Sequence, residues 1–365
     1  MGRRIAVLLG LTLAGAGCGS GHSPASTPRT VAPVHSTSST THPTAPSTTT
    51  TLPAPSTAGP LVASATIPLG ITPGASNPVA AEAPDGAVFV ANPGGGDVLV
   101  VHGTSAPSIA EHVSGTVNAL AADAENLFVA TYTSAYQYSR RTGSLVEQWT
   151  LPPVSRANTS NQLLVGLTVA GGAVWVLITQ GNDVDVYRVT PGSADPPVLV
   201  EETLGAVVGP DATLYYERLD GQLVRQDPSD VVTVGQALST KPAYNGGTAP
   251  YIVGLAGGYL WTEQVYGQGI DAGYQGYNAE SLSYGPWKSG TVGAAMLQTL
   301  AGALWRTGAS SSACPTGMNA CVLRLSASAY LSEPYQADPA SLLLGPYPVL
   351  VEPAASGGWQ MVRLA

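Results

Sequence analysis

Histidine is scarce in the part of this chain that can fold. Only His102 and His112 lie beyond residue 60, and the other three are in a Ser/Thr/Pro-rich stretch: His22, His35 and His42. A catalytic triad needs a base matched to a Ser or Cys nucleophile, and the sequence offers no such pairing. We interpret both remaining histidines as surface residues and predict no catalytic residue.

The best candidate for a metal site is the run Asn182, Asp183 and Asp185. Hard cations such as Ca²⁺ bind several carboxylate oxygens, which this run supplies. However, the run lacks the glycine and the distal glutamate of a calcium loop, and it has the pattern of a hairpin turn that enters a strand. The turn is the better interpretation, so we predict neither a metal nor a cofactor.

Aromatic side chains gather between Val265 and Gly290, which we interpret as an insertion-like loop. Five of them alternate with glycines: Tyr266, Tyr274, Tyr277, Tyr284 and Trp287. Aromatic faces on a Gly-rich loop are suited to stacking on sugars or to contacting a partner protein. We take these five residues as a candidate ligand loop, with packing over their own sheet as the alternative.

Two of the three cysteines are close in sequence. Cys314 and Cys321 are separated by six residues that include Pro315 and Gly317. In an oxidising compartment such a pair predicts a local disulfide, which contributes about 2 to 3 kcal/mol. The alternative is a metal or redox site, but no histidine is nearby and the spacing is not C-x-x-C.

The third cysteine, Cys18, closes a short export signal. Arg3 and Arg4 precede an apolar run, which ends in small residues at positions 14–17. This resembles a bacterial lipoprotein signal, although Gly15 stands where that signal usually has leucine. The resemblance implies that Cys18 becomes the lipid-modified first residue of the mature chain, with ordinary cleavage as the alternative. We therefore predict a signal peptide over residues 1–17.

Residues 18–60 form the predicted tether. Ser, Thr, Pro and Ala dominate this stretch, which has no acidic or aromatic residue. Such a composition cannot bury enough apolar surface to offset the entropy of ordering. We expect a disordered linker that holds the body, residues 61–365, away from the outer face of a membrane.

The body is acidic and poor in charge. All 23 acidic residues lie beyond residue 60, where only 11 of the 14 basic residues remain, so the net charge is 11 − 23 = −12. Nucleic-acid binding relies on Lys and Arg contacts to phosphates, so nucleic acid is excluded as the partner. Electrostatic docking on anionic lipid is excluded for the same reason, which leaves the lipid anchor as the only expected membrane contact.

One pattern recurs seven times in the body. A turn containing Gly, Asp or Asn is followed by small apolar residues and then by a large one. The large residues are Phe89, Phe128, Trp175, Tyr215, Trp261, Trp305 and Leu350, at spacings of 39, 47, 40, 46, 44 and 45. A period in the low forties is typical of a β-propeller blade of four strands. The sequence therefore predicts an all-β, seven-bladed propeller.

The strand count predicts how the ring closes. In the third repeat we expect strands over residues 163–170, 173–179, 183–190 and 197–202. The last repeat has only three candidates, at 341–344, 348–352 and 358–364. Residues 61–67 can supply the missing outer strand, which would leave no open sheet edge in the ring.

The first repeat resembles the YVTN-type propeller repeat. Asn77-Pro78-Val79-Ala80 and Pro84-Asp85-Gly86 match it, and the signature Tyr-Val-Thr-Asn is present as Phe89-Val90-Ala91-Asn92. The match covers the first repeat only. It implies a propeller without implying an activity, because this fold carries lyases, lactonases, redox enzymes and binding modules.

Together these features predict an exported, lipid-anchored monomer. We expect a module that binds or scaffolds a protein or glycan of the cell envelope. The alternative is an extracytoplasmic propeller enzyme of the lactonase, lyase or dehydrogenase class.

Overall fold

The computed structural model describes most of the predicted body. The described residues are 61–72, 77–92, 95–152, 164–180, 183–193, 195–237, 251–266, 271–289, 298–300, 303–308, 321–325, 335–336, 341–344 and 348–365. All of them belong to the second of the two units into which the chain divides, Thr50–Ala365. The predicted signal peptide, Cys18 and the tether lie outside the described residues, so those boundaries remain predictions.

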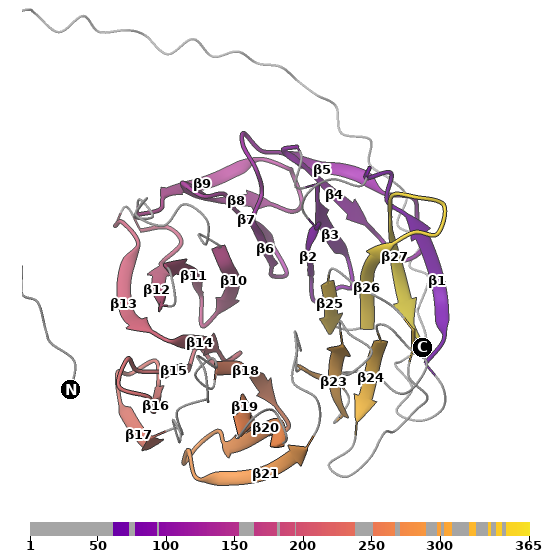
Figure 1. Cartoon of the computed structure of the whole chain (residues 1–365). Helices are drawn as coiled ribbons and strands as arrows, with labels where there is room; N and C mark the ends of the chain where they lie inside the picture. Colours follow the sequence, from indigo (N-terminus) through magenta and orange to yellow (C-terminus); the bar gives the residue numbers. More distant parts are fainter. Residues whose placement is uncertain are drawn as a thin grey trace, which may run out of the picture. The chain divides into compact units, whose positions relative to one another are not determined.

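Strands are the only regular elements among the described residues. They form seven antiparallel sheets, which we call blades and number along the chain (Figure 1). Blades one to three contain β2(Val79–Glu82), β3(Val88–Ala91), β4(Asp97–Val101), β5(Ser108–His112); β6(Ala119–Ala122), β7(Asn126–Ala130), β8(Ser134–Ser139), β9(Leu145–Thr150); β10(Leu164–Ala170), β11(Ala173–Gln180), β12(Asp183–Val189) and β13(Val198–Thr203). Within the described residues, no helix is long and apolar enough to cross a membrane.

The remaining blades continue the same order. Blades four to six contain β14(Gly205–Val208), β15(Leu214–Glu217), β16(Gln222–Gln226), β17(Val232–Ala237); β18(Tyr251–Ala256), β19(Tyr259–Tyr266), β20(Asp271–Asn278), β21(Tyr284–Ser289); β22(Gln298–Leu300), β23(Ala303–Gly308) and β24(Cys321–Leu325). Blade seven contains β25(Ser341–Leu344), β26(Pro348–Pro353), β27(Trp359–Leu364) and β1(Ala63–Pro68). The strands expected in the third repeat agree with β10 to β13 to within one residue at each end.

The two ends of the described body share one sheet. β1 pairs with β27, so the first strand of the body completes the sheet of the last blade, with Ala65 opposite Arg363 and Ile67 opposite Met361. The innermost strands touch in succession from β14 through β18, β22, β25, β2 and β6 to β10, and β12 contacts β14. Figure 1 shows β1 lying outside β27 and β26, beside the first blade. The fold is an all-β β-propeller, whose described strands form seven sheets.

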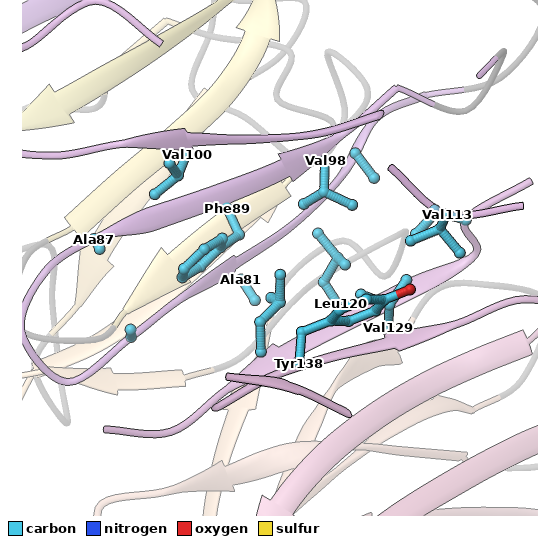
Figure 2. Close-up of a cluster of buried hydrophobic side chains, with 13 residues drawn as sticks. Ala81, Ala87, Phe89, Val98, Val100, Val113, Leu120, Val129 and Tyr138 are labelled. Atoms are coloured by element: carbon cyan, nitrogen blue, oxygen red, sulfur yellow. The ribbon is translucent and has the colours of Figure 1, made fainter. Parts of the chain in front are cut away.

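Among the described residues, alternating side chains build hydrophobic cores between neighbouring blades, from the seam of blades seven and one to that of blades four and five. On β3, Phe89 and Ala91 pack against blade two, whereas Val88 and Val90 pack against blade seven. Figure 2 shows the first of these cores, in which Phe89 lies with Val98 near Leu120 and Tyr138 of blade two. The sheets of blades one to four are thus apolar on both faces, in keeping with the low charge of the body.

The structure corrects the position of the large residue in the seventh repeat. Leu350 was expected to match the large residue of the other repeats, which points toward the following blade. Instead, Val349 and Val351 pack with Val88 and Val90 of blade one. The equivalent position is therefore Val349, because alternation places Leu350 on the side of blade six.

Two other sequence predictions concern core residues. Trp175 and Trp261 are buried at 5% and 2% exposure, as their positions in the repeats predict. Cys321 begins β24 and is fully buried. Its expected partner Cys314 lies outside the described residues, so the disulfide remains a prediction.

Arg363 of β27 links the last blade to the first. Its side chain is 1% exposed, and it donates hydrogen bonds through Nε to the Gly103 carbonyl at 3.0 Å and through Nη2 to the Gly86 carbonyl at 2.8 Å. Its Nη1 lies 3.8 Å from Oε1 of Glu82, which is equally buried. Glu82, Gly86 and Gly103 all belong to blade one, so a single cation spans the closing seam of the ring.

We predict that Arg363→Met destabilises the propeller by about 3 kcal/mol or more, because the substitution leaves the Glu82 carboxylate buried without its cation. Adding Glu82→Gln should recover part of this loss. Urea unfolding followed by tryptophan fluorescence measures both effects, with Arg141→Met, at an exposed arginine, as the control. A double variant no more stable than Arg363→Met would contradict the role of this pair.

Candidate functional site

Both histidines of the body lie at the outer side of blade one. His102 directly follows β4 and is exposed. His112 ends β5, and its Nδ1 lies 2.6 Å from Oδ1 of Asp97, with 77% of the imidazole side chain exposed. They are surface residues on the third and fourth strands, as predicted.

The rejected metal run falls largely within a strand. Asn182 lies outside the described residues, whereas Asp183 and Asp185 belong to β12. Asp185 is 8% exposed and accepts a hydrogen bond from the Tyr187 hydroxyl at 3.3 Å. Among the described residues no group of three His, Cys, Asp or Glu side chains is arranged to hold a metal ion.

The aromatic segment is not a loop, and this corrects the prediction. It forms most of the sheet of blade five, with Tyr266 on β19, Tyr274 and Tyr277 on β20, and Tyr284 and Trp287 on β21. The run of glycines was misleading, because Gly276 and Gly285 are strand residues closely packed against Trp261 and Tyr259. The five residues therefore do not form one mobile ligand loop.

The structure places these tyrosines in two different environments. Tyr274 and Tyr277 are buried at 3% and 1% exposure, so neither is available to a ligand. Tyr284 is 54% exposed, and its ring lies 5.4 Å from that of Tyr277 between centroids. Tyr277 is therefore a core residue, and Tyr284 combines a defined ring contact with an exposed face. The side chains of Tyr266 and Trp287 lie outside the described part of the structure.

The seam between blades four and five holds a buried acid that sequence reasoning missed. Glu217 is the last residue of β15, two residues beyond Tyr215 and opposite Leu223. Tyr215 and Leu223 pack against Leu260 and Tyr277 of blade five, so alternation turns the Glu217 side chain into the same seam. Gly205 lies opposite Glu217 on the innermost strand and adds no side chain there.

Glu217 is buried without compensation. The residue is fully buried, and neither carboxyl oxygen has a hydrogen-bond partner among the described residues. Desolvation raises the pKa of the Glu217 carboxyl from 4.5 to about 8. Because the charged form lacks both water and a cation, the carboxyl holds its proton at neutral pH.

A second acid is shifted in the same direction. Glu111 lies on β5, and its partial burial raises the pKa of the carboxyl from 4.5 to about 7. Its charge in turn contributes to raising the pKa of Tyr138 in the neighbouring blade, where burial is the larger cause. Glu111 and Glu217 lie in different blades, so they do not form one acid–base pair.

The outermost strands carry a repeated surface feature. Each of the six that are described has one or two exposed apolar side chains where it begins, with 44% to 59% exposure. We call these residues the apolar belt: Val62, Ile109, Leu145, Val146, Val198, Leu199, Val231, Val232 and Tyr284. The outer strands lie on the circumference of the propeller (Figure 1), so the belt recurs from blade to blade along the rim.

All parts of the belt lie toward one face of the ring. In an antiparallel blade, the turn after the first strand and the turn before the fourth lie at the same face. The outer strands begin at that face, and both ends of the described body meet there, since the Val62 amide donates to the Ala365 carbonyl. We call it the terminal face, and Glu217 lies toward the opposite face.

Solved structures with known folds resemble this arrangement. The WD40 domain of Toxoplasma gondii coronin aligns with a TM-score of 0.55 at 13% identity, over 85% of this chain and 87% of that chain. Virginiamycin B lyase from Staphylococcus aureus aligns with a TM-score of 0.54 at 14% identity, over 84% and 98%. These proteins share the propeller fold.

Structural similarity to this chain extends to proteins with very low sequence identity. The Cps50 (Swd1) β-propeller domain of Myceliophteria thermophila aligns with a TM-score of 0.55 at only 9% identity, over 84% of this chain and 99% of that chain. No family model matches the chain, and no curated protein matches it in sequence. At such identities the similarity concerns architecture alone.

We predict that Glu217 makes the propeller less stable as the pH rises from about 4.5 to 8. A carboxyl with a raised pKa contributes most when it is protonated, and that contribution is lost as the pH passes through the folded-state pKa. Since one pKa unit corresponds to about 1.4 kcal/mol, the loss amounts to a few kcal/mol.

Glu217→Gln cannot titrate, so its stability relative to the unmodified protein should increase across this interval and then level off. Chemical unfolding at a series of pH values measures the difference. The same substitution at exposed Glu125 is the control. A difference independent of pH would show that Glu217 is not held in its neutral form.

Proposed function

We propose that this chain is an exported, lipid-anchored propeller that binds a partner protein on the outer face of a cell membrane. The observation that supports binding most directly is the apolar belt. Scattered apolar residues are normal on a protein surface, but these recur at the start of every described outer strand. Apolar surface repeated at equivalent positions is typical of a contact site for another macromolecule.

The proposed location rests on the N-terminal sequence. The signal over residues 1–17, Cys18 and the Ser/Thr/Pro-rich stretch resemble a lipoprotein leader and tether. The YVTN-type resemblance of the first blade belongs to the same proposal, although it implies a propeller fold without an activity. A protein held on such a tether can meet envelope components without touching the lipid itself.

A protein fits the surface better than a glycan does. Sugar binding was expected from five aromatic residues in one loop, but Tyr274 and Tyr277 are buried. The exposed surface that remains is mainly aliphatic, with Tyr284 as an aromatic member. Aliphatic and aromatic residues together are characteristic of the buried centre of protein–protein contacts.

An enzyme of the lyase class is the alternative, because virginiamycin B lyase shares the fold. One neighbouring structure is described as a catalytically inactive variant of that lyase in which alanine replaces a histidine, with quinupristin. In this body both histidines, His102 and His112, lie at the outer side of blade one. We therefore favour binding over that chemistry.

We expect a photo-crosslinking amino acid at Val146 to form a discrete protein adduct in the cells that produce the chain. Val146 is 55% exposed on the belt, whereas Leu219, 55% exposed in the turn between β15 and β16, serves as the matched control on the opposite face. Immunoblotting of irradiated cells detects the adducts. Equal labelling from the two positions, or none from Val146, would reject the belt as the binding surface.

We also expect Cys18→Ala to release the chain from the membrane fraction. The thiol of Cys18 is the proposed lipid attachment point, so its loss removes the only expected membrane contact. Fractionation with metabolic labelling by a palmitate analogue measures both effects, with Cys18→Ser as a second variant. A Cys18→Ala chain that stays in the membrane fraction would contradict anchoring through this residue.

A further inference from the structure

Acidic residues outnumber basic ones in the turns of the terminal face. The described turns of that face carry eight acidic residues: Asp85, Asp123, Glu125, Asp195, Asp211, Asp227, Asp230 and Glu280. The same turns carry two arginines, Arg140 and Arg141. Arg140 is already paired with Asp85 at 2.7 Å, and only 9% of its side chain is exposed. The described turn between β15 and β16, at the opposite face, has a single acid, Asp220.

On three adjacent blades an exposed acid lies one to four residues before the apolar belt. In blade three, Asp195 precedes Val198 and Leu199. In blades four and five the same combination recurs, and we call the whole set the acidic edge: Asp195, Val198, Leu199, Asp230, Val231, Val232, Glu280 and Tyr284. The strands β13, β17 and β21 that carry it follow one another along the rim (Figure 1).

Among the described residues, the carboxylates of Asp195 and Asp230 accept hydrogen bonds from neutral side chains. Asp195 accepts a hydrogen bond from the Ser193 hydroxyl at 2.7 Å, and Asp230 accepts one from the Gln226 side-chain amide at 3.1 Å. Both donors are neutral, so they satisfy lone pairs without cancelling the charge. The acidic edge therefore presents negative charge and apolar surface side by side, once per blade.

We propose that the acidic edge binds a segment of the partner protein in which Lys or Arg residues are interspersed with apolar residues. This inference rests on the proposed function and specifies the chemistry of its partner. Opposite charges favour encounter and register, while the aliphatic side chains of the belt supply the buried area. An anionic membrane is the wrong occupant, because the acids of the edge would repel its headgroups.

The probe for this test is a short synthetic peptide of alternating Lys and Leu, with a peptide of alternating Glu and Leu for comparison. Fluorescence anisotropy measures its affinity for the full chain in a nonionic detergent. The edge variant combines Asp195→Lys, Asp230→Lys and Glu280→Lys. The control combines Asp97→Lys, Glu202→Lys and Asp220→Lys, which changes the net charge equally at acids nearer the opposite face.

We expect the edge variant to bind the Lys/Leu peptide about tenfold or more weakly, with the control close to the unmodified chain and the Glu/Leu peptide unbound. Replacing Val198, Val231 and Tyr284 together by Ser should also weaken binding. If reversal of charge disturbs folding, the neutral variant Asp195→Asn, Asp230→Asn, Glu280→Gln keeps the shape and should show a smaller loss.

Four results would overturn the inference. Equally weakened binding in the edge variant and in the control would mean that net charge alone attracts the peptide. Unchanged binding in both would mean that the peptide does not use the acidic edge. Edge-dependent binding to anionic vesicles would identify lipid as the occupant. A crosslinked adduct at Val146 that persists in the edge variant would leave the proposed function intact while rejecting this partner chemistry.

Discussion

The propeller depends on the joining of its two ends at one blade. β27 would be an open sheet edge without β1, and the backbone groups along it would lack partners. Pairing the first strand of the body with the last makes the ring a closed sequence of sheets. The Arg363 guanidinium reinforces this closure, because its hydrogen bonds reach carbonyls of blade one from the third strand of blade seven. The last blade thus contains both ends of the described body, and it contacts the first blade through the buried Arg363 guanidinium.

Closure determines where polar chemistry can be placed. Where a sheet is covered on both faces by its neighbours, residues inside the blades must be apolar or fully compensated. Glu217 departs from this rule, since burial without a hydrogen-bond partner among the described residues keeps its carboxyl neutral at a cost in stability. Other buried charged groups, such as Arg363 and Asp185, have hydrogen-bond partners. The surface that can recognise a partner is therefore the rim and the turns, which is where the acidic edge lies.

Sequence alone predicted the framework because the framework is periodic. The spacing of large residues gave the blade count, and the shortage of strands after residue 344 indicated the closure. Contacts between blades could not be read in this way. Gly171 lies in the turn between β10 and β11, and a Cβ there would meet the Cβ of Ala212 in the next blade at 2.5 Å. The tyrosines were misassigned for the same reason, because glycines in close-packed strands resemble glycines in a loop.

The terminal face gives the length of the tether a physical meaning under the proposed function. The body is joined to the tether at Leu61, beside the face that carries the acidic turns and the start of the belt. A short linker would hold this face against anionic headgroups, which repel it. The 42 residues between Cys18 and Leu61 span roughly 35 Å as a coil and roughly 130 Å if extended. Both values exceed the Debye length of about 8 Å, so a linker of this length frees the acidic face for a cationic partner.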